Sequence, residues 1–311
     1  MTTGSLIAIS VALAMCFGSA PAQQSAPLAW ADVLNAAPDA AVIPDADVRA
    51  RLIATGLPWR VRDRTSGIEM LLIPPGKFTM GVRPSQGEST HAGVPADEVT
   101  IAAPFYLGRT EVTQEQWEKG GRANPSAFQI AAFQATVEAG REVKIKAIMD
   151  GGYTRKEADA KVERAMYKFA ATDQWPVESV SSEEIESFLG ANELRLPTEA
   201  EWEYSCRATT TGARYGELDE IAWVGENAHG TPHAVATKQA NAFGVHDMLG
   251  NVWEWCSDRY QPTDPTAPTT VDARVLRGGN WLSLPVTCTS TYRIGSDVGR
   301  QAYGVRVARN P

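Results

Sequence analysis

The chain has 311 residues and 43% hydrophobic content, enough to bury a sizeable core, and its composition argues against a disordered, collagenous or coiled-coil protein. Lysine and arginine total 29 against 37 aspartate and glutamate, for a net charge of −8, and no segment gathers enough basic residues to follow a phosphate backbone. We therefore expect no nucleic-acid partner.

The N-terminus predicts export. Residues 6–17 form an apolar run that is too short to span a bilayer comfortably, and Ala20-Pro21-Ala22 follows as a small-residue cleavage pattern. We predict a signal peptide over residues 1–22, a secreted or periplasmic protein, and no membrane span, although the segment lacks the usual Lys or Arg. Lipidation at Cys16 is the alternative, which the large Met15 disfavours.

Residues 23–56, rich in Ala, Pro and Asp, are interpreted as a lead-in or linker with one short helix from Ala46 to Thr55. The main domain is predicted over residues 57–311. It opens with short strands at the ranges 68–73, 77–81, 99–101 and 104–107, the first two joined by a Pro-Gly turn.

Three helix starts carry a capping box, in which an N-cap hydroxyl and a Glu or Gln three residues later satisfy each other's free amides. The pairs are Thr113 with Gln116, Ser181 with Glu184, and Thr198 with Glu201. A fourth box, Thr154 with Glu157, lies in an Ala-, Lys- and Glu-rich stretch that we interpret as a helical insertion over residues 129–174, with a packing or docking role. Its apolar stripe consists of Ala158, Val162, Ala165, Met166 and Phe169.

The segment 250–260 contains two tryptophans and two carboxylates. Strand alternation places Trp253 and Trp255 on one face and Glu254 on the other. A buried strand after a tight Gly-Asn turn is one interpretation. The other adds an oxygen-rich cation site, for which the candidate ligands are the side chains of Asp247 and Glu254 and the carbonyls of Gly250 and Val252.

Signal-peptide cleavage leaves three cysteines in an oxidising compartment. Spacing does not fix the pairing. We predict a disulfide between Cys256 and Cys288, because both lie in segments that resemble core-lining strand or turn. Cys206 lies on a predicted helix and is interpreted as a buried, inert thiol.

The order of these blocks closely resembles the formylglycine-generating enzyme (sulfatase-modifying factor) domain family, from about residue 57 to 309 apart from the insertion. The matching blocks are residues 74–81, 111–117, 175–181, 195–207, 241–244, 250–260, 277–281 and 304–308. The resemblance implies one α+β domain with the C-type-lectin-like fold, loop-rich with little regular secondary structure.

The resemblance also implies structural calcium at the four oxygen donors of the 247–254 loop. A second calcium would use Asn227 and the Ala228 carbonyl, but the segment 230–233 supplies no clear counterpart for the remaining ligands.

Enzymes of this family oxidise a substrate cysteine to formylglycine with oxygen and Cu(I), which two cysteines bind. Here the matching positions are Ser283 and Cys288. Cu(I) prefers soft thiolates, and a serine oxygen is a poor substitute, so copper is not expected and Cys288 is left as the one candidate catalytic residue. The resemblance places Trp281, Ser283 and Arg293 nearest the family's active-site groove.

Two functions follow. The first is a secreted, non-catalytic module that binds a peptide, glycan or protein ligand. The second is a formylglycine-generating oxidase that acts on a sulfatase cysteine. Ser283 favours the first.

Overall fold

The computed structural model describes residues 28–82, 96–119, 121–129, 135, 138–168, 174–262 and 272–311, with no side chains described at 163–168. The predicted signal peptide, residues 1–22 with Cys16, lies outside the described residues. Within the described ranges, no helix combines the length and apolar character needed to cross a bilayer.

The larger sheet joins the two ends of the domain. Its strands are β1 (Ala31–Asn35), β2 (Arg60–Asp63), β3 (Glu69–Ile73), β6 (Phe105–Gly108) and β11 (Ala308–Arg309), in the order β1-β2-β3-β6-β11. All pairs are antiparallel, and Leu107 lies opposite both Leu71 and Ala308. β3 and β6 are apolar almost throughout and are buried in the middle of the sheet, as expected of strands covered on both faces.

The second sheet carries the aromatic segment of the sequence. It contains β7 (Trp253–Arg259), β8 (Arg274–Arg277), β9 (Arg293–Ser296) and β10 (Tyr303–Gly304), in the order β10-β7-β8-β9. A separate hairpin pairs β4 (Gly76–Met80) with β5 (Asp97–Ile101). All four strands predicted near the start of the domain are present, but β3 and β4 do not pair with each other across the Pro-Gly turn, because each finds its partner further along the chain.

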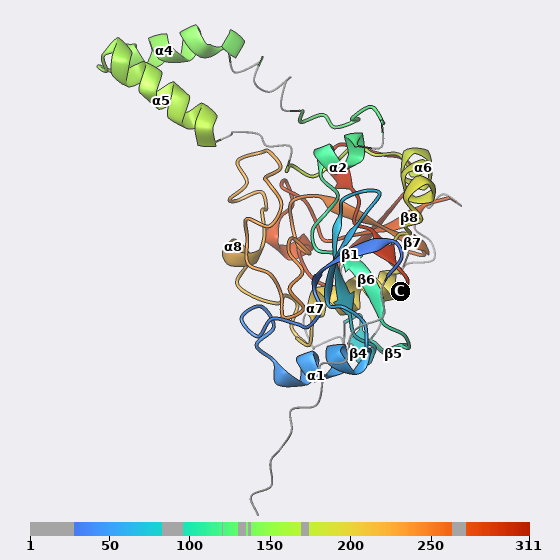
Figure 1. The fold of residues 1–311 in the computed structure, drawn as a ribbon. Helices are drawn as coiled ribbons and strands as arrows, with labels where there is room; N and C mark the ends of the chain where they lie inside the picture. The colour runs from blue at the N-terminus through green and yellow to red at the C-terminus, as the bar shows by residue number, and fades with distance from the viewer. Residues whose placement is uncertain are drawn as a thin grey trace, which may run out of the picture.

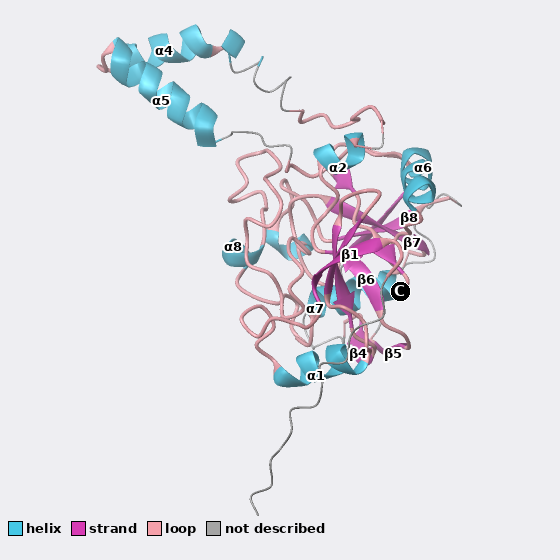
Figure 2. Cartoon of the chain, viewed as in Figure 1, coloured by secondary structure: helices cyan, strands magenta, loops and turns pink. Residues whose placement is uncertain are grey.

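Helices alternate with long loops around the sheets, except for one helix pair that projects from the rest of the molecule (Figures 1 and 2). They are α1 (Ala46–Ala54), α2 (Gln114–Glu118), α4 (Arg141–Asp150), α5 (Arg155–Lys168), α6 (Ser182–Asn192), α7 (Glu199–Arg207), α8 (Leu218–Ile221) and the 3₁₀ turn η1 (Pro285–Thr287). The three predicted capping boxes open α2, α6 and α7, with both reciprocal hydrogen bonds formed in each. Local sequence therefore determines where these helices begin.

Residues 28–56 belong to the folded unit, which corrects their interpretation as a lead-in or linker. β1 pairs with β2, and Val48 and Leu52 of α1 are buried in the main core. The predicted helix is present, and Asp45 caps its first turn. Sequence composition missed this association because the partners of β1 and α1 lie in other segments and are set only by the tertiary structure.

The insertion contains a helical hairpin. Thr154 caps α5 together with Glu157, as predicted, and the buried side chains of Ala158 and Val162 pack with Ile145 of α4. In Figure 1 the hairpin projects from the rest of the molecule. The remaining predicted stripe residues lie where side chains are not described.

Helix α7 connects the layers of the core. Its buried residue Trp202 donates from Nε1 to a Glu254 carboxylate oxygen at 2.7 Å. Glu199 and Glu203, on the same helix, accept hydrogen bonds from buried arginines of the second sheet. A polar network thus ties α7 to β7, β8 and β9 inside an otherwise apolar core.

Candidate functional site

The Gly-Gly turn at Gly278 and Gly279 brings the two family cysteine positions together. Both glycines have positive φ, +98° and +82°. A Cβ on Gly279 would lie 2.4 Å from Cys288 Sγ and 3.3 Å from Ser283 Oγ, so only glycine fits between them. The backbone therefore brings residues 283 and 288 close together, and the first of the two positions carries a serine.

Ser283 takes part in a local turn. Its hydroxyl accepts from the Asn280 backbone N–H at 2.9 Å and donates to the Asn280 side-chain oxygen at 3.0 Å. Both the donor and an acceptor site of the hydroxyl are therefore occupied by one neighbouring residue. This arrangement stabilises the loop and supplies no soft ligand.

Cys288 is fully buried. Burial raises the pKa of its thiol to about 11, although the neighbouring Ser283 side chain opposes that shift. The thiol is thus protonated at neutral pH, and it is the thiolate that attacks substrates or binds metals. On this evidence the candidate catalytic residue is in its unreactive form.

The same loop exposes apolar side chains. Leu282, Leu284 and Val286 are 57%, 66% and 67% exposed. The backbone beneath them is anchored, because Arg214 donates to the Cys288 and Pro285 carbonyls and Gly225 donates to the Ser283 carbonyl. An anchored loop that exposes three large apolar side chains within five residues is a candidate interaction surface.

The other predicted groove residues are buried. Trp281 is fully buried and packs edge-on against Phe128, with ring centroids 5.3 Å apart. Arg293 forms a two-pronged ion pair with Glu199, at 2.7 and 2.9 Å, and also donates to the Gln261 carbonyl. Arg293 is therefore committed to contacts in the core, and its place nearest the family's active-site groove stays a prediction.

The predicted disulfide is absent, since Cys206, Cys256 and Cys288 are all free, buried thiols. Their surroundings explain this correction. Cys288 lies against Gly279 and Ser283, whereas Cys256 lies in β7, where Arg277 and Glu199 are the charged side chains that act on it most strongly. Membership in core-lining segments did not specify which part of the core each cysteine reaches.

The predicted calcium loop 247–254 contains the tight Gly-Asn turn that the sequence suggested. Gly250 has φ of +79°, and a Cβ there would lie 2.3 Å from the Trp223 carbonyl oxygen. Both oxygens of Glu254 accept from Arg306, at 2.6 and 2.9 Å, and one also accepts from Trp202. Glu254 therefore already has a cationic partner, which sequence spacing did not reveal.

Two further acids beside that pair are not satisfied. Oδ2 of Asp247 accepts from the Ala236 N–H, but its Oδ1 has no partner, and both carboxylate oxygens of the fully buried Glu111 also have none. Burial raises the pKa of Asp247 to about 6 and that of Glu111 well above its ordinary value, with the Asp247 charge adding to the latter. The orphaned Asp247 oxygen is compatible with a cation here, although no group of three or more His, Cys, Asp or Glu in the described ranges forms a metal site.

The second family calcium position does not fit an ion. The Asn227 side-chain oxygen accepts from the Val224 N–H at 2.8 Å, and its amide donates to the Ala222 carbonyl. The Ala228 carbonyl lies 2.9 Å from Nε2 of His233. Asn227 therefore caps a turn, and its side-chain oxygen already accepts a backbone hydrogen bond.

Comparisons with known proteins agree with this architecture. Residues 59–311 match the family model described as the sulfatase-modifying factor enzyme 1-like domain. The solved structure of PvdO from Pseudomonas aeruginosa superimposes with a TM-score of 0.59 at 22% identity, covering 81% of this chain and 98% of that one. The similarity in structure confirms the predicted C-type-lectin-like, mixed α and β fold.

Curated relatives have differing activities. The chain is 29% identical over 258 residues to a formylglycine-generating enzyme of Streptomyces coelicolor, covering 72% of this chain and 82% of that protein. It is 29% identical over 288 residues to a hercynine oxygenase of Mycolicibacterium smegmatis, covering 83% of this chain and 65% of that protein. It is 27% identical over 257 residues to an inactive Cα-formylglycine-generating enzyme 2 of Bos taurus, covering 72% and 80%.

Proposed function

Because the chain belongs to the sulfatase-modifying factor enzyme 1-like family, we propose that it is a non-catalytic member that binds a peptide, glycan or protein ligand. One observation carries the proposal: a hydrogen-bonded Ser283 hydroxyl stands where the family's Cu(I) site needs one of its two thiolates. Burial of the second position, Cys288, raises the pKa of its thiol to about 11, which also disfavours a thiolate. A relative of similar identity is itself named inactive, which adds support.

The surface that we assign to ligand binding is the loop patch Leu282, Leu284 and Val286. These side chains are exposed on the loop that also carries Ser283 and Cys288, and Arg214 donates to two backbone carbonyls of that loop. A preorganised loop loses little conformational freedom on binding, and three apolar groups supply area to bury. We also propose that the module acts outside the cytoplasm, on the basis of the apolar segment 6–17.

Calcium at the 247–254 loop is part of the same proposal, as a structural ion. The Asp247 and Glu254 side chains with the Gly250 and Val252 carbonyls would hold it, and Asp247 Oδ1 is the oxygen that it would satisfy. The ion would favour the charged form of Asp247, which burial disfavours.

Cu(I) titration with oxygen uptake on a cysteine-containing sulfatase peptide tests the catalytic question. We expect the native protein to bind Cu(I) weakly and to consume no oxygen. Ser283→Cys should gain tight Cu(I) binding because the turn already places the two positions together, whereas the control Leu282→Cys adds an exposed thiol at the neighbouring position and should not. Peptide-dependent oxygen uptake by the native protein would refute the proposal.

A further inference from the structure

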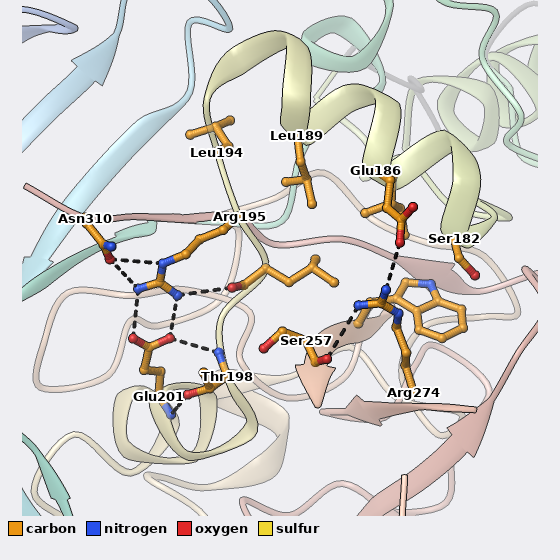
Figure 3. A pocket seen from close by; sticks show the side chains of 13 residues that line it. Ser182, Glu186, Leu189, Leu194, Arg195, Thr198, Glu201, Ser257, Arg274 and Asn310 are labelled. Carbon is orange, nitrogen blue, oxygen red and sulfur yellow. Dashed lines mark hydrogen bonds and ion pairs between the residues drawn. The ribbon is translucent and has the colours of Figure 1, made fainter. Parts of the chain in front are cut away.

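A cavity of about 530 Å³ lies between α6, the segment that leads into α7, and β7 (Figure 3). This volume falls within the range of small-molecule sites, roughly 300–1,000 Å³. None of its lining residues belongs to the 278–288 loop or to the 247–254 loop, so the cavity is separate from the surface assigned above.

The middle of the cavity is apolar. Leu189 of α6, Leu194 and Leu196 before α7, and Trp255 of β7 line it. Trp255 is only 1% exposed, so it forms a rigid wall. Leu189 comes from α6, and the other two leucines come from the segment between α6 and α7. Such a lining favours an aliphatic or aromatic body and excludes a fully polar ligand.

The cavity has a charged group at each side, and the two arginines differ in how fully they are paired. Arg195 is saturated: it contacts both oxygens of Glu201, at 2.6 and 2.8 Å, and it also donates to Asn310 and to the Leu196 carbonyl. Figure 3 shows this group on the side of the cavity away from Arg274. An anion gains nothing at Arg195, because the guanidinium has no donor left for it.

Arg274 retains free donors. It donates to one oxygen of Glu186 at 2.8 Å and makes a long contact of 3.5 Å to the Ser257 carbonyl. A guanidinium has five N–H groups, so most of them have no acceptor among the described residues. The Arg274 side chain is 26% exposed and that of Glu186 is 64% exposed, so the arginine is partly desolvated and its acidic partner can turn into water when another anion binds.

We propose that this cavity binds an aliphatic monocarboxylate of the fatty-acid class. The carboxylate lies on the guanidinium of Arg274, and the hydrocarbon chain extends over Leu189 and Leu196 against Trp255. The cavity is complementary to such a ligand, because Arg274, which has free donors, and the apolar side chains line the same cavity. A hydrophobic peptide with a free C-terminus offers the same chemistry, and the experiment below separates the two sources.

Isothermal titration with octanoate, octanol and octylamine tests the head-group assignment. We expect octanoate to bind and the other two to bind at least tenfold more weakly. Arg274→Gln should weaken octanoate binding about tenfold to a hundredfold, as expected for a lost charge-assisted contact, and Arg274→Lys should restore part of it. The matched control is Arg64→Gln, which removes an exposed arginine paired with Asp32 at 2.8 Å outside the cavity and should change nothing.

Methyl NMR locates the bound chain. We expect octanoate to induce chemical-shift changes at the methyl groups of Leu189, Leu194 and Leu196. We also expect Arg274→Gln to leave the melting temperature of the protein unchanged. Any of four results would overturn the assignment. These are no binding at about 5 mM octanoate, equal binding of octanol, an unaltered octanoate affinity in Arg274→Gln, and shifts confined to other residues. Tighter binding of acetyl-Leu-Leu than of octanoate would overturn the fatty-acid source in favour of a peptide.

Discussion

Glu203 is the residue whose neutralisation should most damage the fold. It is fully buried, and its carboxylate accepts from the Gly81 N–H at 2.9 Å, from Arg207 at 2.9 Å and from Arg277. Burial lowers the pKa of the Arg277 guanidinium. The negative charges of Glu203 and then Glu199 outweigh burial, so the pKa of Arg277 is raised above its ordinary value. Glu203→Gln keeps the size of the side chain and removes the charge on which two buried guanidinium groups depend.

The expected cost follows from the remaining contacts. In the variant, the nearest carboxylate to Arg277 is that of Glu199, 3.7 Å away and already paired with Arg293. Removing one partner of a buried ion pair costs about 3–5 kcal/mol. For a domain of this size that loss corresponds to a fall of about 6–20 °C in melting temperature.

Urea denaturation and thermal melts measure this prediction. Glu69→Gln is the control, because Glu69 pairs with Arg60 and Arg62 at the surface with 24% side-chain exposure, and partly exposed pairs contribute about 0–1 kcal/mol. If Glu203→Gln unfolds within about 1 kcal/mol of the native protein with an unchanged m-value, then the buried network does not carry the stability that we assign to it.

Three further predictions concern the loops. Chelation should lower the melting temperature, by an amount equivalent to about 2.7 kcal/mol for calcium at a hundred times its Kd, and Asp247→Asn should remove that response. An unchanged melting temperature in protein shown by metal analysis to be calcium-free would contradict the structural ion. Because the pKa of Cys288 is raised to about 11 in the folded state, the unfolded chain loses the thiol proton at a lower pH than the folded chain does. This thiol should therefore lower the free energy of urea unfolding by about 1.4 kcal/mol per pH unit between pH 9 and 11, and Cys288→Ala should reduce the slope of that free energy against pH by the same amount. Leu284→Ser with Val286→Ser should leave the melting temperature within about 2 °C of native, because both side chains are exposed; a larger loss would show that the patch packs within the fold.

Local chemistry was readable directly from the sequence. The capping boxes at Thr113, Ser181 and Thr198 open helices as predicted, since the reciprocal hydrogen bonds connect residues only three positions apart. The order of the sequence blocks that match the family identified the family and hence the fold. The presence of Ser283 in place of a second cysteine is likewise a property of the sequence alone.

Partnerships between distant segments were decided only by the tertiary structure. Glu254 meets Arg306, 52 positions later, and Glu199 meets Arg293, 94 positions later, so neither pair could be read from spacing. The same limit explains the disulfide prediction, because two cysteines in core-lining segments reach different parts of the core. Short-range hydrogen bonds are fixed by backbone geometry within one turn, whereas the partner of a buried charge depends on how the whole chain packs, and a single sequence does not encode that packing in any local pattern.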